Sequence, residues 1–402
     1  MIFAVIICFN AFTHGKFSFH NTVYKEKPEM EKITDLTNIP ADPYAYCCKY
    51  KEETGKKIVG YTCSYTPEEI IYAAGALPFR LFGANEGIHL ADANLQSYCC
   101  SLVRGILEEG LSGRLDFLDG AVFPHTCDSF QRLSDIWRIN IAHQFHVDLV
   151  LPVKLNTKSA RQYMIDVLEK FKKDLERALG VKITDAMLSD AIKTYNQIRA
   201  LMMRLYALRN KSPEIISGRD FHSIIKAAMI MDRKLFLKAL GEIAARMERA
   251  SDQKIISSNK RLVLAGSVCS HPDIYDIIEN AGGVVVGDDL CTGSRYFEGV
   301  LDEKASPMEA IANRYLDRPI CPAKHNGLMD RGENIVRMVR ESKADGVVFL
   351  LLKFCDPHAF DYPYIKEMLD KENIPCMLLD MEEQLPAEGQ LQTRFETFIQ
   401  IL

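Results

Sequence analysis

The chain has 402 residues, of which 48% are apolar and 26% are charged, so it can bury large cores and should form two or three domains. Its formal net charge is -5, with 49 Lys and Arg against 54 Asp and Glu. This balance lacks the excess of positive charge that is typical of nucleic-acid-binding proteins. Twelve cysteines are too sparse for a disulfide scaffold in a chain of this length, and they favour a reducing, cytoplasmic compartment.

The first residues, Met1 to about Phe12, form an apolar run that lacks a basic segment before it and is too short to span a bilayer. A cytosolic start at Met30 fits this pattern better. Residues 1–29 are therefore expected to be a doubtful leader or a disordered extension, and no later apolar run predicts a membrane span.

Residues 30–155 are predicted to form an N-terminal α/β module. Short apolar runs typical of buried strands occur at 58–61, 77–81, 118–123 and 147–151. Helices are predicted between them at 67–74, 97–109 and 129–137. This alternation implies a parallel sheet.

Residues 156–256 are predicted to be a helical connector or cap, because strand signals nearly vanish and apolar residues recur at helical spacing. Thr184-Asp185 is a start signal for a long helix there. Residues 257–402 then return to alternation and predict a C-terminal α/β module. Its strands are expected at 262–265, 283–286, 346–352 and 376–379, and its helices at 272–280, 307–316, 334–342, 362–373 and 390–402.

The two α/β modules echo one another. A run from Asp119-Gly to Cys127-Asp128 matches a run from Asp345-Gly to Cys355-Asp356, and the strand and Cys-Ser turn at Cys63 match those at Cys269. Each cysteine follows a predicted strand, where open α/β sheets place their ligands. Two related modules facing a shared site are therefore expected.

No C-x-x-C spacing occurs, so common zinc-ribbon and ferredoxin patterns are absent. A single cysteine is more often a small buried hydrophobe than a ligand, but several here share a strand-end or loop-entrance context. The candidate ligands are Cys100, Cys127, Cys269, Cys291, Cys321 and Cys355. Dispersed thiolates suit an iron-sulfur cluster better than zinc, and three of them would leave one iron open. His125 is a candidate hydrogen-bond donor to a cluster sulfur or a substrate carbonyl.

A combination of segments resembles the 2-hydroxyacyl-CoA dehydratase and benzoyl-CoA reductase family of subunits. They span about 58–402 and are Gly-Tyr-Thr-Cys-Ser-Tyr-Thr-Pro-Glu-Glu (60–69), Ala-Ala-Gly (73–75), Cys-Ser-Leu-Val-Arg (100–104), Pro-His-Thr-Cys-Asp (124–128), Gly-Asp-Asp-Leu-Cys-Thr-Gly-Ser-Arg (287–295), Lys-Phe-Cys-Asp-Pro (353–357) and Gly-Gln-Leu-Gln-Thr-Arg (389–394).

The resemblance implies an α/β protein with two Rossmann-like or flavodoxin-like parallel-sheet modules and a helical insertion. It further implies a [4Fe-4S] cluster on Cys100, Cys127 and Cys355, a substrate-contacting serine near Ser64, a related second subunit as heterodimer partner, and an ATP-dependent iron-sulfur activator. The implied reaction is anaerobic: an (R)-2-hydroxyacyl-CoA loses water through a ketyl radical and becomes an enoyl-CoA.

Several alternatives stay open. A benzoyl-CoA reductase-type subunit would need the same electron path. A double-cubane [8Fe-9S] reductase of the same family, or an electron-relay protein with that cluster, would add Cys291 and Cys321, with Cys269 as a further candidate. A two-lobed binding protein with buried cysteines would contain no iron.

Overall fold

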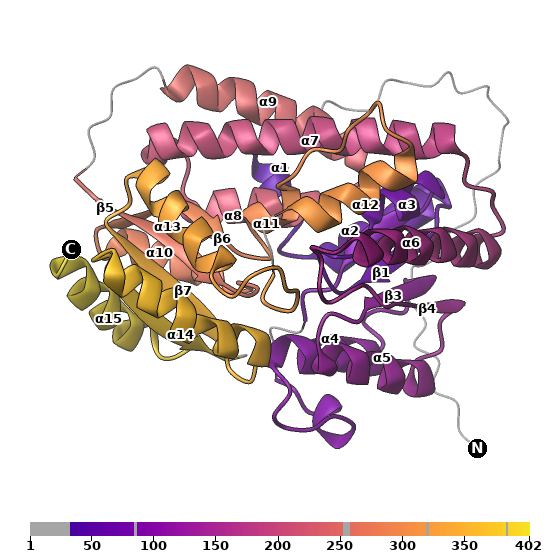
Figure 1. Ribbon diagram of the computed structural model, residues 1–402, viewed down its shortest axis with the longest axis horizontal. Helices are drawn as coiled ribbons and strands as arrows, with labels where there is room; N and C mark the ends of the chain where they lie inside the picture. The colour runs from indigo at the N-terminus through magenta and orange to yellow at the C-terminus, as the bar shows by residue number, and fades with distance from the viewer. Residues whose placement is uncertain (1–32, 84–86, 252–257, 319–320, 383–384) are drawn as a thin grey trace, which may run out of the picture. The chain divides into compact units, whose positions relative to one another are not determined.

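The computed structural model describes residues 33–402, except 84–86, 252–257, 319–320 and 383–384 (Figure 1). The expected leader at 1–29 lies outside these residues. In the described part, no helix is long and apolar enough to cross a membrane.

The N-terminal sheet contains β1 (Ile58–Tyr61), β2 (Leu77–Arg80), β3 (Gly120–Pro124) and β4 (Phe145–Leu149). All neighbours pair in parallel, in the order β2-β1-β3-β4. Every residue of β1, β2 and β3 is buried, as expected for strands covered on both faces. The predicted strands are thus confirmed, with shifted ends for β3 and β4.

The C-terminal sheet repeats this topology with β5 (Lys260–Gly266), β6 (Gly283–Asp289), β7 (Gly346–Leu352) and β8 (Cys376–Met381). Its strands are also all parallel, in the order β6-β5-β7-β8. The predicted pair of parallel-sheet α/β modules is confirmed, and the matching strand orders agree with the echoes in the sequence.

Helices and 3-10 turns connect the strands within each module. In the N-terminal part they are α1 (Ile33–Asn38), α2 (Pro43–Thr54), α3 (Glu68–Ala73), η1 (Ala91–Ala93), α4 (Ser101–Leu111) and α5 (Asp128–Asn140). In the C-terminal part they are α10 (Asp273–Asn280), α11 (Ser294–Phe297), α12 (Pro307–Asp317), α13 (Asp330–Ser342), α14 (Asp356–Lys371) and α15 (Glu388–Gln400).

One predicted helix boundary is wrong in a way that affects the site. Sequence analysis starts a helix at Tyr362, whereas α14 begins at Asp356 and continues through Pro363. Asp356-Pro357 is itself a good helix start, because proline fits the first turn, where no intrahelical N–H bond is lost. The earlier start makes Cys355 the N-cap residue of α14.

The segment between the modules is helical, as predicted. It contains α6 (Lys158–Leu179), α7 (Asp185–Lys211), η2 (Pro213–Ile215), α8 (Gly218–Ala228) and α9 (Arg233–Ser251). Thr184 caps α7 by accepting a hydrogen bond from the backbone N–H of Met187, which confirms the start signal. Figure 1 shows α7 alongside α9, and α7 also contacts α3 of the first module and β6 of the second. The domain limits 30–155, 156–256 and 257–402 stay a prediction.

The two sheets share one hydrophobic core. This core joins Leu77 and Phe123 of the N-terminal sheet to Leu264 and Leu350 of the C-terminal sheet. Several cysteines belong to it or pack against it, namely Cys47, Cys99, Cys100, Cys127, Cys269, Cys291 and Cys355. The modules therefore meet where thiols gather.

Candidate functional site

The strand order places cysteines beside the topological switch point of each sheet. The order reverses between β1 and β3 in one sheet and between β5 and β7 in the other, and α/β proteins bind ligands outside the carboxyl ends of such strands. Cys63 and Cys127 follow β1 and β3, and Cys269 and Cys355 follow β5 and β7. Both switch points thus carry thiols.

Cys100, Cys127 and Cys355 each occupy the N-cap position of a helix. These helices are α4, α5 and α14, and none of the three caps has a side-chain hydrogen bond to the helix. A helix N-terminus presents unpaired N–H groups and a partial positive charge, which favour a thiolate. The sequence pattern thus delivers three thiols to positions suited to anionic sulfur.

These three thiols form a closed electrostatic triangle. Cys100 interacts with Cys127, Cys127 with Cys355, and Cys355 with Cys100, each neighbour raising the pKa of the other thiol. Burial is the larger cause, and together the effects raise the pKa of Cys100 and of Cys127 to about 12 and that of Cys355 further. The thiols would need a cationic group between them to ionise together.

The backbone before Cys355 is strained. Phe354 has a φ of 64°, in the left-handed region that aromatic residues rarely adopt. Such conformations cost about 1–3 kcal/mol and cluster at functional sites. The turn at Phe354 separates the end of β7 from the start of α14 and places Cys355 at their junction.

A second set of cysteines borders the triangle. Cys321 interacts with Cys291 and Cys63, and both Cys127 and Cys355 interact with Cys321. Cys63 was not among the candidates from sequence, although it follows β1 as Cys127 follows β3. The position of Cys63 directly after a predicted strand was the sequence signal that could have identified it as a candidate.

Cys269 lies apart from this group, despite its equivalent place in the second module. Its thiol contacts the backbone of His271 at 3.5 Å and interacts with Lys226 and Asp288, rather than with another cysteine of the described part. Burial raises its pKa to about 12. All eleven cysteines in the described part are free thiols.

Cysteine thiolates are the ligands that hold iron-sulfur clusters. Within the described residues, no three His, Cys, Asp or Glu side chains are arranged to hold one metal ion. Zinc-bound sulfurs lie about 2.3 Å from the metal, and hence within about 4.6 Å of one another. A polynuclear cluster places iron and sulfide between its ligands and needs a wider arrangement. Three mutually interacting thiols at helix N-termini, that of the buried Cys100 and those of the half-buried Cys127 and Cys355, fit that donor set.

Basic side chains border the cysteines. Arg295 interacts with Cys291 and Cys321 and pairs with Asp289, its Nε lying 3.1 Å from Oδ1. Arg318 interacts with Cys63, and Lys324 with Cys63 and Cys321. Ser64, the serine suggested by the resemblance, accepts a long 3.5 Å contact from Nη2 of Arg318. The electrostatic environment on this side of the thiols is therefore positive.

The candidate His125 is held by a neighbouring carboxylate. Its Nε2 lies 2.8 Å from Oδ1 of Asp148, which also contacts Ser134 and His146. Hydrogen bonds and charge from these side chains outweigh burial and hold the pKa of Asp148 well below its usual range. His125 is thus oriented toward Asp148 and not toward a thiol.

His358 is a residue that sequence analysis missed. It lies in the first turn of α14, with Nδ1 3.2 Å from Sγ of Cys355. Its side chain is buried, and burial lowers its pKa well below the usual value, with help from Arg295 and Arg331. The i,i+3 spacing from Cys355 becomes a recognisable signal only once α14 is known to begin at Asp356.

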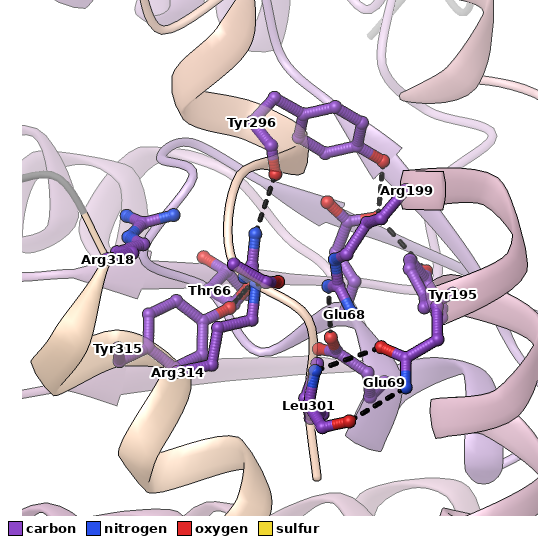
Figure 2. Close-up of polar contacts among 12 residues, drawn as sticks. Thr66, Glu68, Glu69, Tyr195, Arg199, Tyr296, Leu301, Arg314, Tyr315 and Arg318 are labelled. Atoms are coloured by element: carbon purple, nitrogen blue, oxygen red, sulfur yellow. Dashed lines mark hydrogen bonds and ion pairs between the residues drawn. The ribbon is translucent and has the colours of Figure 1, made fainter. Parts of the chain in front are cut away.

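A buried polar network surrounds Glu68 and Glu69, the first two residues of α3 (Figure 2). Glu68 of α3 pairs with Arg233 and accepts hydrogen bonds from the hydroxyls of Tyr61, Tyr195 and Tyr296. Glu69 pairs with Arg199 of α7. These contacts join the first module, the helical segment and the second module, so the network positions the start of α3.

An open pocket of about 390 Å³ lies next to Cys321 and the start of α14. Lys324, His325 and Arg331 line one part of it together with Asp361, which pairs with Arg331, while Phe360 and Tyr364 supply an aromatic part. A pocket of this composition suits a ligand that carries both an anionic and an apolar portion.

A family model described as "2-hydroxyglutaryl-CoA dehydratase, D-component" matches residues 63–402. The chain belongs to this family. Among similar proteins, the (R)-phenyllactyl-CoA dehydratase beta subunit of Clostridium sporogenes is 28% identical over 370 residues, covering 92% of this chain and 98% of the relative. The resemblance seen in the sequence is thereby confirmed.

Two further relatives are subunits of different enzymes. A benzoyl-CoA reductase subunit of Thauera aromatica is 30% identical over 351 residues, covering 86% of this chain and 90% of the relative. The (R)-2-hydroxyglutaryl-CoA dehydratase beta subunit of Acidaminococcus fermentans is 27% identical over 384 residues, covering 92% and 98% respectively. The chain thus resembles subunits of 2-hydroxyacyl-CoA dehydratases and a subunit of a benzoyl-CoA reductase.

Proposed function

We propose that this D-component chain is the iron-sulfur subunit of an (R)-2-hydroxyacyl-CoA dehydratase. The overall reaction removes the hydroxyl from carbon 2 and a proton from carbon 3 as water and leaves an enoyl-CoA. The names of the relatives as beta subunits support a related partner subunit. An ATP-dependent iron-sulfur activator and a cytoplasmic location complete the proposal.

The triangle of Cys100, Cys127 and Cys355 carries this proposal. Three thiols from both modules reach helix N-termini, and those of Cys127 and Cys355 directly follow β3 and β7 at the switch points. A [4Fe-4S] cluster would find three anionic ligands there. Bound there, a cluster supplies one-electron reducing chemistry, which the ketyl-radical route to the enoyl-CoA requires. Ordinary acid–base catalysis gives roughly 10²–10⁴-fold and does not activate a β-hydrogen enough.

In this proposal the residues of the chain bind the cluster and orient the acyl-CoA. The three cysteines hold the cluster, and the basic and aromatic pocket beside α14 provides complementary surface for an acyl-CoA. Ser64 and His125 stay candidates for contact with the thioester carbonyl, since each lies within two residues of a cysteine of the site. His125 would be oriented in that role by Asp148.

Iron analysis tests the proposal directly. Anaerobically purified wild-type protein should contain about four iron and four sulfide per chain. Cys100→Ser, Cys127→Ser and Cys355→Ser should each lose most of it, whereas Cys269→Ser and Cys376→Ser, outside the triangle, should retain it. Full iron content in a folded triangle variant would refute the ligand set. Together with a partner subunit and activator, the wild type should dehydrate a 2-hydroxyacyl-CoA.

An aromatic-ring reductase subunit is the second candidate, supported by the 30% identity to the benzoyl-CoA reductase subunit of Thauera aromatica. An assay that offers an aryl-CoA beside a 2-hydroxyacyl-CoA separates the two activities. A double-cubane cluster is the alternative cofactor, supported by the placement of Cys63, Cys291 and Cys321 beside the triangle. It predicts about eight iron per chain, and loss of half or more in Cys321→Ser.

A further inference from the structure

Two buried cations near Cys63 and Cys321 have no carboxylate partner in the part of the chain that the structure describes. Arg318 and Lys324 are 5% and 2% exposed, and within the described residues neither has an Asp or Glu oxygen at ion-pair distance. Arg318 stacks over the rings of Tyr65 and Tyr315, with its Cζ 4.0 and 5.0 Å from their centroids. Within the described residues, therefore, no carboxylate balances either buried charge.

The hydrogen bonds of these cations are few and weak. Nζ of Lys324 donates to the carbonyl of Leu151 at 3.3 Å, and Arg318 donates to the carbonyl of Arg295 at 3.3 Å and to Ser64 at 3.5 Å. Nε of Arg318 is buried without a hydrogen-bond partner among the described residues. Figure 2 shows Arg318 to one side of the network, away from Glu68 and Glu69. Burying such charges is costly unless an anion accompanies them.

The fold fixes Lys324 at the junction between the modules. The backbone of the neighbouring His325 pairs with the segment after β4: its N–H donates to Val153, and its carbonyl accepts from Leu155. The acidic groups that act most strongly on the cations are the tyrosines Tyr65 and Tyr315 and the thiols Cys63 and Cys321. Positive charge from the second module thus faces sulfur of both modules.

We propose that Arg318 and Lys324 form a cationic wall that binds the negative charge of a thiolate-ligated iron-sulfur group and sets its reduction potential. The inference rests on the proposed function. Each positive charge favours the reduced cluster, because reduction adds an electron. Both residues are positioning residues in this role. The same charges destabilise the protein when the anionic group is absent, and that cost distinguishes the wall from an ordinary structural contact.

The first test uses the apoprotein. Lys324→Met removes a buried charge while keeping an apolar side chain of similar length, so the iron-free variant should have a higher Tm than iron-free wild type. Arg199→Met is the matched control, because Arg199 is also buried but pairs with Glu69, and it should lower the Tm. A purely structural role predicts a lower Tm for both variants.

The second test uses iron-loaded protein. In an EPR-monitored redox titration, Lys324→Met and Arg318→Gln should make the midpoint potential more negative, with a tenfold lower electron affinity corresponding to about 59 mV for a one-electron couple. Lys324→Arg and Arg318→Lys keep the charge and should restore the wild-type potential. Lys366→Met, an exposed cation on α14, should leave the potential unchanged.

The outcomes separate this inference from the proposed function. Wild type that binds iron, with an unchanged potential in Lys324→Met and in Arg318→Gln, refutes the cationic wall and leaves the dehydratase proposal standing. Wild type that takes up no iron refutes the proposed function, and the wall with it. A higher apoprotein Tm together with a more negative potential supports both.

Discussion

The Sγ atom of Cys355 lies 3.2 Å from Nδ1 of His358, one turn further along α14. Burial keeps the pKa of His358 well below its usual value, so the imidazole is neutral at physiological pH. A neutral imidazole carries one N–H, and with that proton on Nδ1 it can donate to a thiolate. Donation to a ligand sulfur stabilises negative charge there and raises the potential of an iron-sulfur cluster.

We therefore expect His358→Leu to lower the midpoint potential of iron-loaded protein and to speed iron loss to a chelator. His358→Asn places an amide N–H near the position of Nδ1 and should recover part of both properties. EPR titration and chelator kinetics measure these effects. Identical midpoint potentials in wild type and His358→Leu would mean that the contact between His358 and Cys355 does not affect the reduction potential of the cluster.

Replacing the carboxylate of Glu68 should strongly destabilise the protein. Glu68→Gln leaves the fully buried Arg233 without its counter-charge, and removing one partner of a buried pair costs about 3–5 kcal/mol. Thermal and urea unfolding measure the loss. The matched control is Glu367→Gln, which breaks an exposed pair with Lys371 and should cost less than about 1 kcal/mol. Equal losses for the two variants would rule out a structural role for the network.

Glu109 should make stability depend on pH. Burial raises the pKa of Glu109 from 4.5 to about 7, although Tyr44 donates a hydrogen bond to it. The folded state then binds more protons than the unfolded state between these values, so this group makes the unfolding free energy fall as pH rises from about 4.5 to about 7.

Glu109→Gln removes that titration. The variant should be more stable than wild type at pH 8, by on the order of 3–4 kcal/mol, because one pKa unit corresponds to about 1.4 kcal/mol. The difference should shrink as pH approaches about 4.5. Tm values measured across this pH range check it, with Glu53→Gln on the exposed surface of α2 as control. A difference that does not change with pH would contradict the prediction.

Gly266 at the end of β5 should not tolerate a side chain. Its φ is 133°, and a Cβ there would overlap the carbonyl oxygen of Leu350 on β7. The backbone strain alone costs about 1–3 kcal/mol, and the overlap adds to it. Gly266→Ala should therefore lower the Tm markedly. Gly241→Ala, in open space on α9, should instead raise the unfolding free energy by about 0.5–1 kcal/mol. An unchanged Tm in Gly266→Ala would contradict the expected overlap with Leu350.

Much of the fold follows from local sequence signals. The run from Gly346 to Leu352 is continuously apolar between turn residues, and β7 has those bounds. The capping residue Thr184 likewise marks the start of α7. The start of α14 was missed because Pro363 lies inside the helix, and an internal proline suggests a helix boundary where none exists.

The site was predicted less completely, because tertiary packing decides which strand-end residues meet. Cys127 and Cys355 were found from their positions after strands, and the structure brings them together with Cys100. The echo between Cys63 and Cys269 suggested equivalent roles, yet Cys63 borders the triangle and Cys269 lies beside Lys226. Buried cations leave no periodic pattern, so the cationic wall could not be predicted before the fold was known.

The order of the thiols along the chain has a consequence for biosynthesis. Cys100 and Cys127 belong to the first module and leave the ribosome before Cys355, which follows β7 of the second module. The last partner of the triangle arrives only after the helical segment and most of the second module have been made. A prosthetic group that needs all three sulfurs would therefore gain its last protein ligand only after β7 has been synthesised, and the first module alone could not complete its site.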